Sequence, residues 1–162
     1  MDNFTPNDYL GKHISDLQKE MALNFNDDSG KSFRIFDTNT KYLFGQTVTD
    51  TFVKTNNHNI VVSVSTYYRN DLKEEVYKAM IKTYGEPKSI LKEDVKTEQK
   101  EFVLENWGTV VSKSYSLKHV SHSEVPILIV WQNKDVQIVV TNNPKNNSLK
   151  ILFTQTALNT ES

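Results

Sequence analysis

Residues 125–155 read VPILIVWQNKDVQIVVTNNPKNNSLKILFTQ, and this stretch decides the fold. It contains three apolar runs separated by two short segments rich in Asn, residues that favour turns. The apolar runs are 125–132, 136–141 and 149–155, and the turns are 133–135 and 142–147. Strands joined by such short turns run antiparallel, because a parallel pair needs a long crossover connection. The stretch therefore predicts an antiparallel meander.

The pattern inside each run indicates how much of the strand is covered. Val136, Ile138 and Val140 occupy alternate positions, as in a strand with one buried face. The run 149–155 alternates in the same way. Residues 125–131 are apolar on both faces, which is typical of a central strand.

The rest of the chain also favours strands over helices. Val, Ile, Thr, Phe, Tyr and Trp total 57 residues, whereas Ala, Leu and Met total 18. Since β-branched and aromatic side chains suit a pleated surface, this excess predicts a sheet-dominated domain. Upstream strands are expected at 33–36, 42–54, 60–68, 88–92, 101–107 and 114–120. The intervening segment 92–101 carries seven charges of mixed sign and is interpreted as a solvated hairpin tip.

Side-chain alternation assigns the two faces of the upstream strands. In 42–54, one face carries Phe44, Gln46, Val48, Asp50 and Phe52, and the other carries Thr47, Thr49, Thr51 and Val53. In 60–68, one face carries Ile60, Val62, Val64, Thr66 and Tyr68, and the more polar face carries Val61, Ser63, Ser65 and Tyr67.

Two helices are expected. Ser15 and Gln18 form a capping-box pattern, and the apolar positions that follow predict a helix over about 15–25. The second helix is predicted over 71–84, with Asp71 as its cap. Its apolar residues recur every four positions, and Gly85 with Pro87 ends it.

Together these elements predict one α+β domain over 1–162, with two helices on one face of a mostly antiparallel sheet of about seven strands. Each helix precedes a set of strands, so a tandem helix-plus-hairpins repeat is an open alternative to chance similarity of the two halves. Residues 1–9 are expected to form a loose lead-in and 157–162 a flexible tail.

The composition excludes several classes of protein. The chain has no Cys, hence no disulfide, thiolate zinc site or cysteine nucleophile. A net charge of −1, with only two Arg, predicts no nucleic-acid partner. No apolar run is long enough for a spanning helix. The first twelve residues lack the regions of a signal peptide, which leaves a cytoplasmic protein or a mature domain after a removed signal.

The sequence gives little support to catalysis or metal binding. His119, His122 and Glu124 form the densest metal-capable cluster, but only the last two share a strand face, and zinc needs at least three protein ligands. We therefore expect no metal, no cofactor and a polar turn there. No nucleophile elbow or HExxH motif occurs, so no catalytic residue is assigned. A glycosidase-type carboxylate pair, distant in sequence, is an open alternative.

A candidate binding face follows from the strand assignments. The face opposite the helices is expected to carry Ser63, Ser65 and Tyr67, with Thr47, Thr49 and Thr51 from the neighbouring strand. Interfaces are depleted in Lys and Glu and enriched in Tyr. We take Tyr67, Ser65 and Thr49 as candidate binding residues. The alternative is an ordinary solvated face whose Ser and Thr serve β-propensity. Among other aromatic residues, Trp107 and Trp131 are candidates for a contact face or for the core.

Two short motifs resemble those of a known group. Leu10–Leu17, LGKHISDL, is similar to the entry into the first helix of small bacterial envelope domains, and Tyr84–Pro87, YGEP, to a helix exit that they use. The group includes outer-membrane assembly lipoproteins of the BamE type and the β-lactamase inhibitor protein. The resemblance implies short helices on one face of an antiparallel sheet, binding to other proteins and a periplasmic or extracytoplasmic location.

These observations predict a non-catalytic bacterial module that binds or inhibits another protein through its free sheet face. One alternative is a carrier of a small ligand in a cavity between helix and sheet. The other is a hydrolytic enzyme with a carboxylate-based site.

Overall fold

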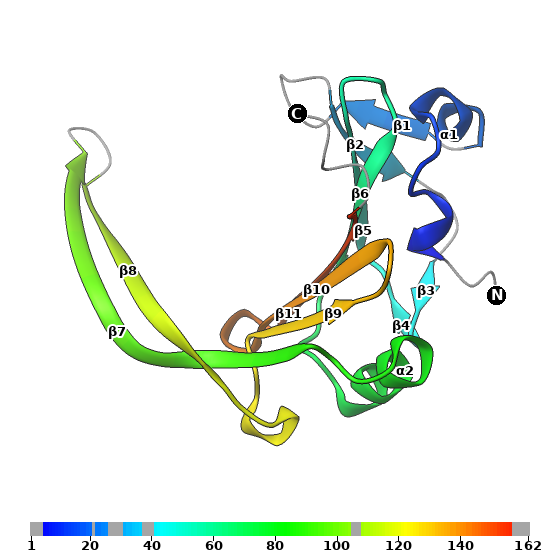
Figure 1. Cartoon of the computed structure of the whole chain (residues 1–162). Coiled ribbons are helices and arrows are strands. Elements are labelled where there is room, and N and C mark those ends of the chain that lie inside the picture. The colour runs from blue at the N-terminus through cyan, green and yellow to red at the C-terminus, as the bar shows by residue number, and fades with distance from the viewer. Residues whose placement is uncertain (1–4, 21, 26–30, 37–40, 105–107, 157–162) are drawn as a thin grey trace.

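The fold is given by a computed structural model that describes residues 5–20, 22–25, 31–36, 41–104 and 108–156 (Figure 1). Trp107 and the terminal segments 1–4 and 157–162 lie outside these residues. The described helices are α1 (Ile14–Glu20) and α2 (Glu74–Tyr84), with short 3₁₀ helices η1 (Pro6–Asp8), η2 (His122–Glu124) and η3 (Pro144–Asn146). The strands are β1 (Ala22–Phe25), β2 (Ser32–Phe36), β3 (Tyr42–Leu43), β4 (Gln46–Thr47), β5 (Asp50–Thr55), β6 (Val61–Tyr68), β7 (Ser89–Leu104), β8 (Gly108–His119), β9 (Leu128–Gln132), β10 (Val136–Asn143) and β11 (Ser148–Gln155).

Nine of these strands form one sheet in the order β1-β2-β5-β6-β11-β10-β9-β7-β8, and β3 with β4 forms a separate hairpin. Every neighbouring pair is antiparallel. The strands after α1 occupy one half of the sheet and those after α2 the other, and the last strands of the two sets, β6 and β11, pair at the junction. The predicted α+β class and antiparallel sheet are confirmed, and the described residues place nine strands in the sheet where about seven were predicted.

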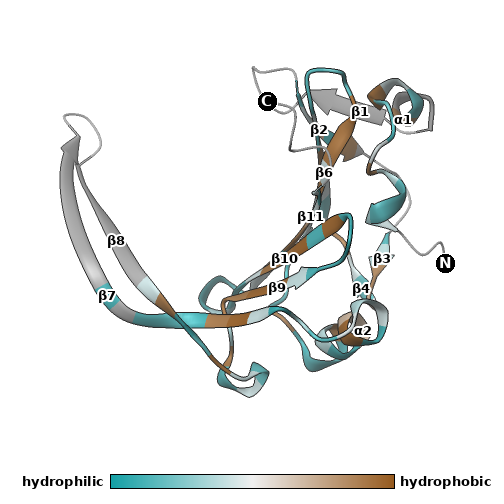
Figure 2. Ribbon diagram, in the orientation of Figure 1, coloured by the Kyte–Doolittle hydropathy of each residue, from teal (hydrophilic) through white to brown (hydrophobic). Residues whose placement is uncertain are grey.

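Both helices lie on the same side of the sheet, as predicted (Figure 1). Ile14 and Leu17 of α1 and Val76 and Met80 of α2 belong to one apolar cluster with the strands. The described apolar strand residues that are under 2% exposed are Val53, Val61, Val64, Ile129, Trp131, Ile138, Val140, Leu149, Ile151 and Phe153. Figure 2 shows the hydrophobic residues that recur along the central strands and α2. Burial of each large apolar side chain stabilises the fold by roughly 1.5–3 kcal/mol.

The start of α2 differs from the prediction. Asp71 does not cap the helix, which begins at Glu74 with Lys73 at the cap position. Instead, the Leu72 N–H donates to Oδ1 of Asn142 over 2.9 Å, and the Asp71 N–H donates to Oδ1 of Asn147 over 3.1 Å. Asn147 at the end of η3 and Asn142 of β10 thus bind the backbone just before the helix, whereas a local cap would accept from the N–H groups of its first turn.

The end of α2 is confirmed at Gly85. This residue has φ 79°, a conformation that glycine adopts without a steric cost, and its N–H donates to the Ile81 carbonyl over 2.8 Å. Nε1 of the buried Trp131 donates to the Gly85 carbonyl over 2.8 Å. The side chain of Trp131 therefore belongs to the core and fixes the helix exit against β9.

The first helix is shorter than predicted. α1 ends at Glu20, and Ala22–Phe25 forms β1 rather than a helical turn. Hairpin pairing with β2, with Leu23 opposite Ile35, outweighs the weak helical periodicity of this segment. Within the predicted lead-in, residues 6–8 form η1, and both Pro6 and Tyr9 are buried.

Segment 42–54 is not one strand. Phe44 and Gly45 both have positive φ, and they form the two-residue turn of the β3–β4 hairpin. The predicted alternation of the next strand is also displaced at one point: a β-bulge between Lys54 and Thr55 pairs Thr55 with Val61, so Val61 is fully buried where Val62 was expected.

The charged segment 92–101 is not a hairpin tip, because it lies within β7. β7 pairs with β9 only through Ser89–Leu91, and beyond Leu91 its described pairing is with β8. Figure 1 shows the two strands leaving the sheet as a long curved ribbon. We call residues 92–104 of β7 and 108–118 of β8 the arm.

The burial of α2 generates the first prediction. Val76 is 2% exposed and Met80 is fully buried, so Val76→Asp places an unpaired charge in the core. We expect a loss of at least about 4 kcal/mol in the free energy of unfolding, measured by urea denaturation. Lys82→Asp, at an exposed position of the same helix, should cost under about 1 kcal/mol. A Val76→Asp variant that melts as cooperatively as the wild type would contradict this packing.

The start of α2 generates the second prediction. Asn142 is 4% exposed, accepts from Leu72, and donates through Nδ2 to the Pro126 carbonyl over 3.0 Å. Asn142→Ala leaves the part-buried Leu72 N–H and the buried Pro126 carbonyl without these partners and should cost about 2 kcal/mol in thermal or urea unfolding. Asp71→Ala should change stability by about 0.5 kcal/mol or less. Equal costs for the two variants would restore Asp71 as the cap.

Candidate binding face

The sheet has a second face, opposite the helices, that we call the open face. Strand alternation places on it the residues between the buried ones, and the register aligns them in rows across the strands. The central row runs Arg34, Phe52, Ser65, Leu152, Val139, Val130 and Ser89, from β2 to β7. Phe52, Leu152, Val139 and Val130 are all half-buried by their neighbours alone. We call these four residues the apolar row.

More polar rows flank the apolar row on both sides. One runs Ser32, Lys54, Ser63, Thr154, Gln137 and Gln132, and the other runs Asp50, Tyr67, Lys150, Thr141, Leu128 and Leu91. The open face therefore has an apolar centre with a mainly hydrophilic border. This is the distribution found in protein interfaces, where a hydrophobic centre is surrounded by a polar rim.

A pocket of about 330 Å³ lies at one end of the apolar row, and we call it the aromatic pocket. It is lined by Ser32, Phe52, Val53, Lys54, Ser63, Ser65, Tyr67, Lys150 and Leu152. The rings of Phe52 and Tyr67 meet edge to face, with centroids 5.4 Å apart and planes at 79°. This geometry holds both rings in place, because the edge of one aromatic ring is attracted to the face of another.

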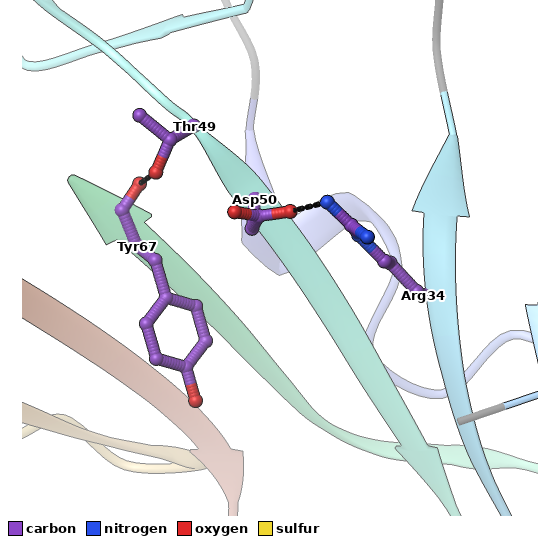
Figure 3. Close-up of polar contacts among 4 residues, drawn as sticks. All are labelled: Arg34, Thr49, Asp50 and Tyr67. Carbon is purple, nitrogen blue, oxygen red and sulfur yellow. Dashed lines mark hydrogen bonds and ion pairs between the residues drawn. The ribbon is translucent and has the colours of Figure 1, made fainter. Parts of the chain in front are cut away.

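Cations surround the aromatic pocket. Nζ of Lys150 lies 5.5 Å from the centroid of the Tyr67 ring, and Cζ of Arg34 lies 6.0 Å from that of Phe52. Arg34 also forms an ion pair with Asp50 (Figure 3). Within the described part of the chain, no carboxylate forms an ion pair with Lys54 or Lys150.

A second pocket, of about 380 Å³, lies where the arm leaves the sheet. Leu117 of β8, 47% exposed, contributes to its wall together with Leu128 and Thr141 of the open face. The turn around η3 forms its other side through Asn143 and Lys145. The two pockets lie at opposite ends of the open face.

The structure places two of the three candidate binding residues on the open face. Tyr67 and Ser65 both line the aromatic pocket. Thr49 is exposed but lies just before β5, and its Oγ1 donates to the backbone carbonyl of Tyr67 over 2.9 Å (Figure 3). Figure 3 also shows the Tyr67 ring directed away from Thr49. Thr49 thus positions the backbone of β6 and does not join the pocket.

The predicted Thr strip does not form. Thr51 is 3% exposed and faces the helices, opposite Thr66 on β6, while Phe52 faces outward. The register between β5 and β6 decides which face of β5 is covered by the helices. This register cannot be read from the sequence of one strand alone. The open face consequently carries an apolar row, and its charge includes Lys54 and Lys150.

Sequence reasoning missed the apolar row. A signal for part of it was present, since residues 125–131 are apolar at both alternations and Val130 is one of the outward residues. Leu152 and Val139 also fill the outward positions of strands whose inward positions are apolar. No signal in the sequence indicated that these residues align with Phe52, because that requires the order of the strands.

The histidine cluster forms a different structure from a metal centre. His122 belongs to η2, a polar turn as expected, in which Ser121 and Glu124 form a reciprocal capping box. The His122 ring stacks on Tyr77 of α2, with centroids 3.8 Å apart and planes 8° from parallel. Within the described ranges, no group of three His, Cys, Asp or Glu side chains could hold a metal ion.

Comparisons with known proteins add nothing to the description of the site, so its interpretation depends on its geometry. No protein-family model, curated protein or solved structure matches the chain. Among the described helices, none is both long and apolar enough to cross a bilayer.

The contact between His122 and Tyr77 generates the third prediction. Burial lowers the pKa of His122 below its ordinary value of 6.5, and this effect outweighs the opposing attraction of Glu74. The unfolded chain therefore takes up a proton first as the pH falls below about 6.5, so protonation favours unfolding. We expect His122→Phe, which keeps a ring on Tyr77, to lose less stability than the wild type between pH 7.5 and pH 5.5.

Urea unfolding at the two pH values measures this difference. Carboxylates such as Glu124, whose pKa is lowered mainly by the Ser121 N–H, titrate in both proteins and so largely cancel in the comparison. Equal losses in His122→Phe and the wild type would show that His122 does not contribute.

Proposed function

We propose that this protein is a non-catalytic module that binds another protein through the open face. The observation that carries the proposal is the apolar row, which no described helix covers although it crosses the middle of the sheet. Contiguous apolar surface with a polar rim marks interaction sites, whereas single exposed apolar residues are ordinary. Thr at the outward positions of the apolar row would supply much the same β-propensity as Phe, Leu and Val. Packing against a partner therefore explains the apolar side chains better than β-propensity does.

The size of the open face supports the same function. The central row crosses seven strands, which is about 29 Å at the usual strand spacing. With its two flanking rows, the face covers roughly 600 Å² in projection, close to the ~800 Å² that each partner contributes to a typical stable interface. The face is therefore large enough to bind a folded protein.

The arrangement of helices and sheet also supports this function. The helix side of the sheet is filled by large side chains such as Trp131, Phe153 and Met80, all under 2% exposed. Both pockets described above include outward residues of the open face, such as Leu152 and Leu128. The motifs at 10–17 and 84–87 resemble those of bacterial envelope domains that bind other proteins, and the proposal extends that function to this chain.

A substitution in the centre of the open face tests the proposal. Val139→Lys places a charge in the middle of the apolar row, and Gln132→Lys makes the same addition at the rim. Both variants should melt within a few degrees of the wild type, because neither side chain belongs to the core. Proteins retained by the immobilised wild type are identified and purified. Each of them is then titrated by calorimetry against the wild type, Val139→Lys and Gln132→Lys.

We expect Val139→Lys to weaken binding of the true partner about tenfold or more, since a lysine must then be desolvated at the centre of the interface. Gln132→Lys should change the affinity by a factor of about three or less. The proposal is wrong if no retained protein distinguishes Val139→Lys from the wild type.

A further inference from the structure

The charges of the open face are distributed unevenly. Its rows between β2 and β9 hold three basic residues, Arg34, Lys54 and Lys150, and one acidic residue, Asp50. Since Asp50 is paired with Arg34, the two lysines give this region a net positive charge in a chain whose total charge is −1. Both lysines line the aromatic pocket, and none of the described carboxylates forms an ion pair with them.

The register places the lysines at opposite corners of the pocket. Lys54 is next to Ser63 in one flanking row, and Lys150 is next to Tyr67 in the other. Between them lie the hydroxyl of Ser65 and the rings of Phe52 and Tyr67. A group that enters the pocket can therefore contact apolar ring surface, with hydroxyl and ammonium donors around it.

Resting on the proposed function, we propose that the aromatic pocket receives an acidic side chain of the partner protein. The aliphatic part of a Glu or Asp side chain packs against Phe52 and Tyr67. Its carboxylate accepts from Ser65 and from the ammonium group of Lys150, and Lys54 attracts a second carboxylate at the opposite corner. A neutral or basic side chain in the same place would leave both ammonium groups partly desolvated and unpaired, so the pocket selects for negative charge.

Nucleic acid is a less suitable occupant than an acidic protein segment. Aromatic rings and lysines can also bind single strands, which need a basic groove that follows the backbone. Here the described lysines of the pocket number two, and the row next to them is aliphatic through Leu152, Val139 and Val130. An aliphatic row favours the apolar side chains of a protein over a phosphate backbone.

Titration with short capped peptides tests this inference separately from partner capture. The probes are acetyl-Val-Glu-Leu-Glu-Val-amide and the same peptide with Gln in place of Glu, added to isotope-labelled protein while backbone amide signals are recorded by NMR. The acidic peptide should shift the amides of Phe52, Ser65, Tyr67 and Lys150, with a dissociation constant in the millimolar range. The Gln peptide should bind about tenfold more weakly or worse, and salt should weaken the acidic peptide.

The double variant Lys54→Gln/Lys150→Gln should lose affinity for the acidic peptide about tenfold, whereas Lys134→Gln should stay within twofold of the wild type. Lys134 is a matched control because it is exposed in the turn between β9 and β10, outside the pocket. Equal binding of the two peptides, or wild-type affinity in the double variant, would overturn the inference.

Two further outcomes separate this inference from the proposed function. If Val139→Lys abolishes partner binding while the acidic peptide shifts none of the four amides, the interaction function stands and the choice of an acidic group is wrong. If an oligodeoxythymidine shifts the same amides at lower concentration than the peptide, the pocket is a nucleic-acid site and the inference fails.

Discussion

The pairing of β6 with β11 is the contact on which the rest of the structure depends. It joins the strands that follow α1 to those that follow α2, and its register sets Val64 opposite Phe153 and Thr66 opposite Ile151 beneath the helices. On the other side, the same register sets Ser65 opposite Leu152 and Tyr67 opposite Lys150. One ladder thus fixes both the core and the aromatic pocket, because a slip of one residue would exchange the two faces.

Local patterns predicted the elements whose burial follows from their own sequence. The strands predicted at 136–141 and 149–155 are found, with slightly longer bounds, as β10 and β11, and α2 ends where the Gly85 stop signal placed its end. The prediction for Ala22–Phe25 was wrong because the periodicity of this segment suits a helix, whereas its pairing with β2 decides its conformation. The predicted start of α2 was wrong because Asn142, which accepts from the Leu72 N–H just before the helix, lies 70 residues away in the chain.

The candidate site was likewise predictable only in part from local sequence patterns. Tyr67 and Ser65 could be predicted as outward residues because alternation along β6 needs no partner strand. Thr51 could not be assigned, since a Thr suits either face of a sheet and only its register with Thr66 places it under the helices. The apolar row spans the five adjacent strands β5, β6, β11, β10 and β9, so it becomes visible only when the order of these strands is known.

The attachment of the arm has a consequence for how this surface can vary. Only Ser89–Leu91 of β7 pair with β9, and from Leu91 outward β7 is described as pairing with β8. Adding or deleting one residue in each strand of the ribbon changes its reach by about 3.4 Å and leaves the register of every other strand intact. The arm is therefore a part of the molecule whose length can diverge between relatives while the open face beside it is preserved.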